Sequence, residues 1–178
     1  MSWRRFFSPY LLLSASAREE IVAKNQLLEY ETGHDSVVVG LAPSSFDYAH
    51  LNVAFRIIKG ETTTNTSHDI PLIATHKAKY VQTESGSLSL GPGPFVTALE
   101  HATGVKATVV GKPTRKFFET VINSFCDTEV VAEFGTGRIA VIGDDIEADL
   151  GEGAVELNLW RILGKAVAYV EEGLTDCF

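Results

Sequence analysis

Residues 138–151 read RIAVIGDDIEADLG, and this stretch decides the fold class. Ile139–Ile142 is an uninterrupted apolar run, and Asp144 and Asp145 follow the glycine that ends it. Apolar runs without polar alternation are typical of parallel strands that are covered on both faces. Open α/β sheets bind ligands at the carboxyl ends of their strands. The stretch therefore predicts a parallel strand whose acids lie at a ligand-binding edge.

A second motif, GKPTRKFF, occupies residues 111–118. It places Lys112 between a predicted strand at 106–110 and a helix that we expect to start at Pro113. The N-terminus of a helix attracts anions through its free N–H groups and its dipole. A cation for a phosphate and carboxylates for a metal form half of a magnesium-assisted phosphoryl-transfer site. The candidates for this site are Lys112, Asp144, Asp145 and Asp149.

The acidic stretch has two other interpretations. The first is a solvated loop with an aspartate that caps a helix. The second is a calcium loop that starts at Asp145, but Leu150 stands where that loop requires glycine. In the magnesium interpretation Asp144 is the best-placed direct ligand. Asp149 would return to the same site through a water or an amide.

The rest of the chain alternates between predicted strands and helices. Strands are expected at 10–13, 36–39 and 71–76. Residues 48–58 show helical spacing after a capping Ser44 or Ser45, and 93–103 is a helix opened by Gly93 and Pro94 and closed by Gly104. The polar segment 61–69 and residues 82–87 are predicted as a loop and a turn. This alternation indicates an α/β fold.

Composition excludes several classes of protein. Of the 178 residues 45% are hydrophobic and 21% charged, so a buried core is expected. A net charge of −8 argues against a nucleic-acid groove, and no apolar run approaches the roughly 20 residues that span a membrane. The two cysteines and five histidines show no spacing typical of disulfide frameworks or zinc sites.

The first 17 residues, MSWRRFFSPYLLLSASA, loosely fit a targeting segment because arginines precede a short apolar stretch. Ser8 and Pro9 break that stretch, which favours a buried strand. The expected location is cytoplasmic, and the alternative is a secreted or organellar protein.

Four stretches, taken in order, resemble the haloacid dehalogenase-like (HAD) hydrolases. They are VVVGLAPSSFDYAHLNVAFRIIKGE, PLIATHKAKY, SLSLGPGPFVTALEHATGVKATVVGKPTRKFFE and AVIGDDIEADLGEGA. The likeness covers roughly residues 9–163 and is strongest to the subclass with an αβ cap inserted in the core. It implies an αβ cap at 9–106, the C-terminal part of a Rossmann-like core at 107–163, and a divergent tail at 164–178.

The resemblance also implies a chemistry. Lys112 matches the lysine that steadies the nucleophile and the phosphoryl group. Asp144 matches the metal-binding aspartate and Asp149 its acidic supporter, with Asp145 beside them. Relatives are Mg²⁺-dependent phosphatases that work through an aspartyl-phosphate on a small phosphorylated substrate. The cap would set specificity and, in relatives, form the contact of a homodimer.

The sequence departs from that family in one decisive respect. Family members carry an Asp-x-Asp nucleophile motif before the cap, and none of the eight aspartates here forms such a pair after an apolar strand. We therefore expect a truncated or alternatively spliced product, or an imperfect gene model, with little or no turnover. The alternative is a non-enzymatic cap module that dimerises with or regulates a full-length relative. A receiver-like phosphoryl acceptor is disfavoured, because no lone aspartate stands in that order with a lysine.

Overall fold

The structure is a computed structural model that describes residues 8–25, 33–61, 70–83, 85–124 and 139–164. The chain divides into two compact units, Met1–Gly111 and Lys112–Phe178, hereafter unit 1 and unit 2. Residues 62–69 of the loop predicted at 61–69, the two cysteines and the tail from residue 165 lie outside the described residues. No described helix is both long and apolar enough to cross a membrane.

Unit 1 is built on a parallel sheet in the order β1-β2-β3-β6. Its strands are β1 (Pro9–Leu12), β2 (Ser36–Val39), β3 (Leu72–Ala74) and β6 (Thr108–Val109). Leu12 pairs with Val39, and Val39 with Ala74. The predicted α/β class is thus confirmed. The strand that sequence places at 106–110 pairs with β3 and belongs to unit 1, while the division into a cap and a partial core stays a prediction.

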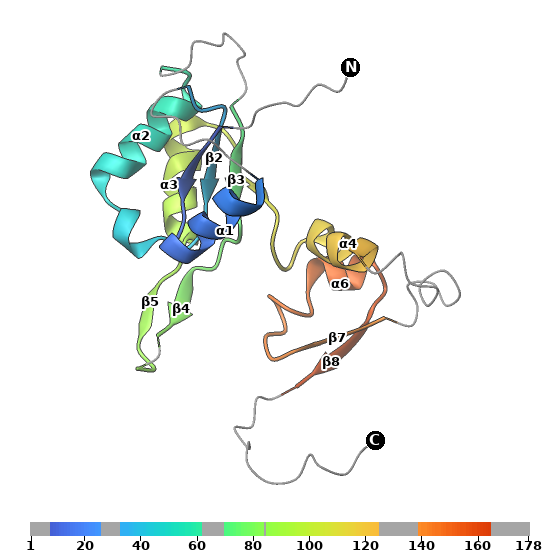
Figure 1. Cartoon of the computed structure of the whole chain (residues 1–178). Coiled ribbons are helices and arrows are strands. Elements are labelled where there is room, and N and C mark those ends of the chain that lie inside the picture. The colour runs from blue at the N-terminus through green and yellow to red at the C-terminus, as the bar shows by residue number, and fades with distance from the viewer. Residues whose placement is uncertain (1–7, 26–32, 62–69, 84, 125–138, 165–178) are drawn as a thin grey trace, which may run out of the picture. The chain divides into compact units, whose positions relative to one another are not determined.

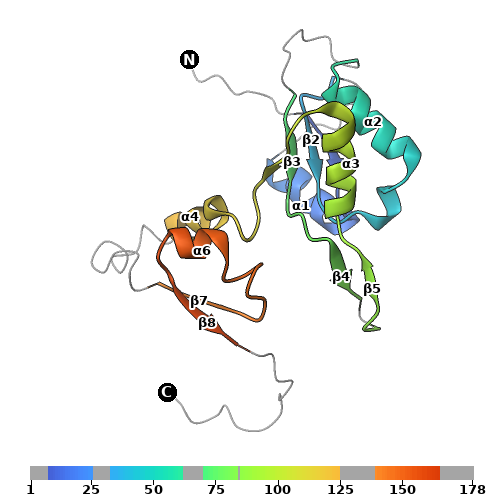
Figure 2. The same cartoon turned by 180° about the vertical axis from the view of Figure 1, so that it is seen from behind.

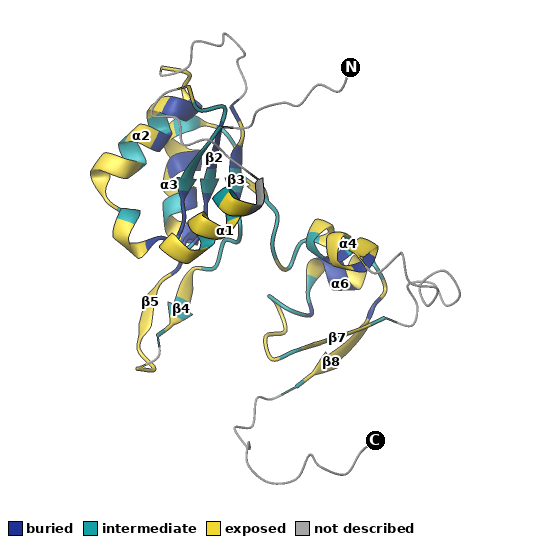
Figure 3. Ribbon diagram, in the orientation of Figure 1, coloured by how far each residue is buried: buried dark blue, intermediate teal, exposed yellow. Residues whose placement is uncertain are grey.

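Three helices accompany this sheet: α1 (Ala15–Asn25), α2 (Tyr48–Ile58) and α3 (Gly93–Thr103). Figures 1 and 2 show α1 and α3 on opposite faces of the sheet. The core lies on the side of α2 and α3, where alternate strand residues meet the buried faces of these helices. A buried leucine or isoleucine stabilises the fold by about 1.5–3 kcal/mol. The fully or almost fully buried members include Leu12, Val37, Val39, Ile57, Leu72 and Val96. Figure 3 colours the buried parts of the sheet and its helices dark blue.

The structure corrects the predicted cap of helix α2. Ser44 and Ser45 do not cap this helix, because they lie in a short 3₁₀ turn at Pro43–Ser45. The cap is Asp47, whose carboxylate accepts the N–H of His50 at 2.9 Å. Pro43 fixes the backbone for the 3₁₀ turn, and this moves the helix start beyond both serines. For α3 the prediction is confirmed: the helix spans Gly93–Thr103, and Gly104 ends it with φ +79°.

A two-stranded antiparallel hairpin leaves the sheet after β3. Its strands are β4 (Tyr80–Gln82) and β5 (Leu88–Leu90). Pairing of Tyr80 with Leu90 and of Gln82 with Leu88 puts three large apolar side chains on one face, and Tyr80, Leu88 and Leu90 are each more than 60% exposed.

Unit 2 contains α4 (Arg115–Ser124), β7 (Ala140–Gly143), α6 (Glu152–Glu156) and β8 (Trp160–Leu163). The strands pair in parallel, Ala140 with Trp160 and Ile142 with Ile162. Helices α4 and α6 enclose a small core made of Phe118, Ile122, Ala154 and Leu159. Helix α4 begins two residues later than predicted. Thr114 precedes it and accepts the N–H of Phe117, while the Pro113 carbonyl accepts the N–H of Gly153.

Candidate functional site

The acids after β7 form one closed turn. The Asp145 carboxylate accepts the N–H groups of Glu147 and Ala148 through the same oxygen, at 2.9 and 2.8 Å. The Asp145 carbonyl accepts the N–H of Asp149 at 2.9 Å. An aspartate that bonds backbone groups two and three residues ahead stabilises a turn locally. Asp145 therefore caps the turn, as the interpretation of this stretch as a solvated loop predicts. Because the turn is closed, Asp149 lies close to the end of β7.

Lys112 and Asp149 form the central contact of the site. Lys112 Nζ lies 2.6 Å from Asp149 Oδ1, although 37 residues separate the two in sequence. The other oxygen of Asp149 accepts the N–H of Asp145 at 3.3 Å. The Asp149 side chain is 13% exposed and that of Lys112 is 50% exposed. The lysine is thus anchored at one point while half of its side chain faces solvent.

The environment of Asp149 keeps it ionised. The hydrogen bond from Lys112 holds the pKa of the Asp149 carboxyl below its ordinary value; burial opposes this, and the N–H groups of Asp145 and Asp144 add to it. A lowered carboxyl pKa stabilises the fold above the pKa of the unfolded state. That stabilisation is lost as pH falls through the folded-state pKa. At neutral pH the Asp149 carboxyl is therefore ionised.

Two glycines to which the sequence analysis assigned no role shape the site. A Cβ at Gly143 would lie 2.3 Å from Asp149 Cβ and 2.6 Å from its Oδ2. A Cβ at Gly153 would lie 2.3 Å from the backbone nitrogen of Arg115. Only glycine lets Asp149 approach β7 and lets α6 approach the first turn of α4 this closely. A glycine between an apolar strand and an acid is the signal that could have identified Gly143.

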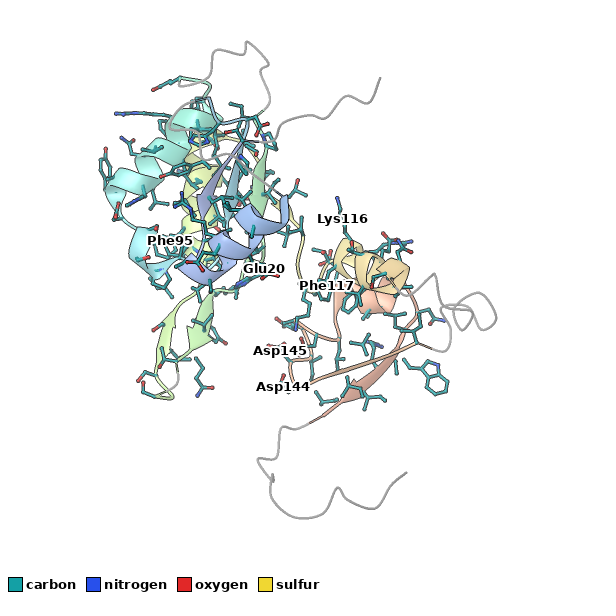
Figure 4. The ribbon with its side chains drawn as sticks, viewed as in Figure 1. Glu20, Phe95, Lys116, Phe117, Asp144 and Asp145 are labelled. Atoms are coloured by element: carbon teal, nitrogen blue, oxygen red, sulfur yellow. The ribbon has the colours of Figure 1, made fainter. Side chains whose placement is uncertain are left out.

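Asp144 behaves differently from its neighbours. It is exposed at the end of β7, and its side chain forms no hydrogen bond or ion pair with another described residue. Figure 4 shows Asp144 and Asp145 at the same end of this strand. Within the described ranges no three His, Cys, Asp or Glu side chains are grouped to hold a metal ion. The structure thus joins Lys112 to Asp149 but does not gather all three predicted carboxylates around one point.

These residues can still hold a hard cation in one way. Mg²⁺ is bound through one or two carboxylates and completes its shell with waters and substrate phosphate oxygens. The Asp145 and Asp149 carboxylates are engaged by N–H groups and by Lys112. Asp144 alone presents an unengaged carboxylate at the strand end. A Mg²⁺ ion held at this strand end would therefore take Asp144 as its direct protein ligand, and the other two acids could act only as its support.

The described histidines lie in unit 1, whereas Lys112 and the acids of this site lie in unit 2. His76 is half-buried just after β3 in unit 1, and its Nδ1 accepts the N–H of Ala78 at 3.4 Å. Burial lowers the pKa of its imidazole, so the ring is neutral at physiological pH. This environment supports a packing role for His76.

Comparison with known proteins finds relatives of this chain in sequence and in fold. No family model matches the chain. It is 45% identical over 136 residues to human haloacid dehalogenase-like hydrolase domain-containing protein 2, covering 76% of this chain and 46% of that protein. It is 34% identical over 144 residues to human phospholysine phosphohistidine inorganic pyrophosphate phosphatase, covering 80% and 46%. The chain spans about half the length of the curated relatives it matches.

Solved structures agree in fold. The thermostable NPPase of Geobacillus stearothermophilus superposes with a TM-score of 0.69 at 23% identity, covering 93% of this chain and 61% of that one. A glycerol phosphate phosphatase from Mycobacterium tuberculosis in complex with magnesium superposes with a TM-score of 0.64 at 26% identity, covering 90% and 44%. In sequence the chain is thus a homologue of haloacid dehalogenase-like hydrolases over about half of their length, and the solved structures share its fold.

Proposed function

We propose that unit 2 carries the phosphate-binding lysine and the metal-binding acids of a Mg²⁺-dependent phosphomonoester hydrolase. The observation that carries this proposal is the Lys112–Asp149 pair, held at the carboxyl end of an apolar parallel strand. The names of the relatives support it, since one is a pyrophosphate phosphatase and one solved neighbour is a phosphatase in complex with magnesium. The substrate class is a small phosphorylated molecule.

Each residue has a distinct task in this proposal. Lys112 Nζ offers positive charge to the phosphoryl oxygens, and Asp149 fixes its position. Asp144 binds the metal, while Asp145 closes the turn that orients Asp149. Bound Mg²⁺ would supply a second centre of positive charge for the phosphate. Preorganised charge of this kind stabilises the transition state because it needs no rearrangement when the phosphoryl group moves.

The 178-residue chain by itself should show no phosphatase turnover. Phosphoryl transfer through an aspartyl-phosphate needs a nucleophilic carboxylate, and no Asp-x-Asp pair occurs anywhere in this sequence. Purified chain, assayed with Mg²⁺ and p-nitrophenyl phosphate, is expected to give the same rate as a Lys112→Ala control.

Activity that co-purifies with the chain and disappears in the Lys112→Ala variant would contradict this prediction. It would mean that another carboxylate of this chain acts as the nucleophile. The matched control is Lys116→Ala, which removes an exposed cation four residues away on α4.

Mg²⁺ should bind weakly, with a dissociation constant on the order of millimolar, because a single protein carboxylate and waters make a poor cage for this ion. Amide chemical shifts followed during a Mg²⁺ titration should move at residues 143–149 and at Lys112. Asp144→Asn should abolish these changes, and Glu152→Gln should leave them intact. Micromolar affinity would show that the described carboxylates form a complete site, and unchanged shifts would show that they form none.

A second candidate function is a non-enzymatic module based on unit 1. Its own sheet and core support it, as does the exposed apolar face of the β4–β5 hairpin. An exposed apolar face of this kind marks an association surface. The partner would be a second copy or a full-length relative. Light scattering tests self-association: a mass above that of the monomer that falls to the monomer when Leu88 and Leu90 are replaced by serine supports the module, and a monomeric native chain contradicts pairing with a second copy.

A further inference from the structure

Arg161 ties strand β8 to the turn that presents Asp149. Its guanidinium Nη1 donates to the Leu150 carbonyl at 3.3 Å. Arg161 pairs in register with Val141, which packs on the core of unit 2, so the arginine side chain leaves the sheet on the side of α4 and α6. Leu150 directly follows Asp149 and is 4% exposed. Water therefore has little access to this carbonyl, and the guanidinium supplies a hydrogen bond to it.

The chain on either side of Leu150 is closely packed. A Cβ at Gly143 would lie 2.3 Å from the Cβ of Asp149, and a Cβ at Gly151 would lie 2.4 Å from the Glu147 carbonyl oxygen. The residues just before and just after Leu150 are thus both in tight contact with other backbone segments. Close-packed protein transmits a displacement instead of absorbing it. A shift of the Leu150 peptide group must therefore move Asp149 as well.

The position of the Lys112 side chain depends on Asp149. Lys112 Nζ lies 2.6 Å from Asp149 Oδ1, whereas half of the lysine side chain is exposed. A long exposed lysine samples many rotamers unless an anchor selects one of them. The backbone beside it is fixed separately, because the Pro113 carbonyl accepts the N–H of Gly153 at 2.8 Å. The freedom of the ammonium group is thus set by Asp149, and Asp149 lies in the turn to which Arg161 is bonded.

From these contacts we propose that Arg161 is a positioning residue for the phosphate-binding lysine. This inference rests on the proposed function, because it assigns Arg161 to the same site. The arginine acts through the Leu150 carbonyl and Asp149, without touching the phosphate. Loss of its N–H donors frees the Leu150 peptide group, and the Lys112–Asp149 pair then samples a wider range of positions. A preorganised site binds an anion more tightly than a mobile one, since less order has to be created on binding.

The test measures the binding of inorganic phosphate to the full chain and to its Arg161→Met variant. Methionine keeps an unbranched side chain but has no N–H donor. The phosphate affinity is followed by the amide shifts of residues 111–115 at fixed ionic strength. It should fall about fivefold in Arg161→Met, the usual effect of losing one hydrogen bond. Every chain also carries Trp3→Phe, so that urea unfolding can be followed through Trp160 as the single tryptophan.

A double-mutant cycle separates positioning from the charge of the guanidinium. Lys112→Ala should weaken phosphate binding at least about tenfold. In that background Arg161→Met should change the affinity by less than about twofold, because a residue that acts through Lys112 has nothing left to position. Lys116→Met is the matched control: it removes an exposed cation of unit 2 and should weaken binding by less than about twofold in both backgrounds.

The possible failures are distinguishable. Phosphate binding that is absent, or that Lys112→Ala leaves unchanged, would contradict the proposed function and this inference with it. A loss in Lys112→Ala without a loss in Arg161→Met would overturn the inference alone. Equal losses from Arg161→Met with and without Lys112, or an equal loss from Lys116→Met, would show that the guanidinium acts only by its charge. Loss of the cooperative urea transition in Arg161→Met would show that the arginine serves the fold and not the site.

Discussion

Replacing Glu100 with alanine should lower the free energy of unfolding of unit 1 by about 2 kcal/mol, because removal of this buried carboxylate leaves the N–H of Ala107 and the partly buried Lys77 without their partner. Glu100 lies near the end of α3 and is 7% exposed. One carboxylate oxygen accepts Lys77 Nζ at 2.8 Å, and the other accepts the N–H of Ala107 at 2.9 Å. A single side chain thus ties α3 to the segments before β4 and before β6. Urea unfolding of the variant measures the loss.

Glu100→Gln is the matched control, and it adds a pH signature. Hydrogen bonding from Lys77 lowers the pKa of the Glu100 carboxyl below its ordinary value of 4.5, although burial opposes the shift. Because the folded-state pKa is lowered, the charged form stabilises unit 1 above the unfolded-state pKa, and this contribution is lost as pH falls through the folded-state value. The native chain and Glu100→Gln should therefore differ at neutral pH and converge in acid. A pH-independent difference, or a loss below about 1 kcal/mol in Glu100→Ala, would show that solvent replaces the pair.

Gly153→Ala should destabilise unit 2 by about 2–3 kcal/mol, the usual cost of forcing an added methyl group into a packed contact. Helix propensity alone predicts the opposite sign, because alanine is favoured over glycine within a helix by about 1 kcal/mol. Three backbone atoms of Thr114 and Arg115 lie within 2.6 Å of the position that the added Cβ would take. These atoms cannot rotate away as a side-chain tip can, so α6 must shift from α4 and the bond between Gly153 N–H and the Pro113 carbonyl must lengthen.

The control for this prediction is Glu152→Ala in the same short helix. Its side chain is exposed, and the substitution should change stability by less than about 0.5 kcal/mol, as is usual at such surface sites. Thermal unfolding monitored by Trp160 fluorescence in the Trp3→Phe background reports on unit 2. A stabilised Gly153→Ala variant would show that the two helices separate easily and that propensity dominates.

The sequence by itself determined the fold class and most of the elements. Apolar runs such as 36–39 and 139–142 and the helix-ending signal at Gly104 act locally, so they can be recognised without knowledge of distant residues. The same applies to the choice of Lys112 and the acids at 144–149 as site candidates, since a lysine after one strand and carboxylates after another indicate the chemistry without coordinates.

The tertiary structure alone decided how these residues meet. The pairing of Lys112 with Asp149 over 37 residues, and of Lys77 with Glu100 over 23, depends on packing between elements that the sequence cannot place. The same packing makes glycine necessary at 143 and 153, because that requirement comes from atoms of other segments. It also left Ile142, Trp160 and Ile162 exposed in the described part of unit 2, where an apolar strand had predicted cover on both of its faces. An apolar run specifies that a strand prefers burial, but only the neighbouring elements determine whether both of its faces receive it.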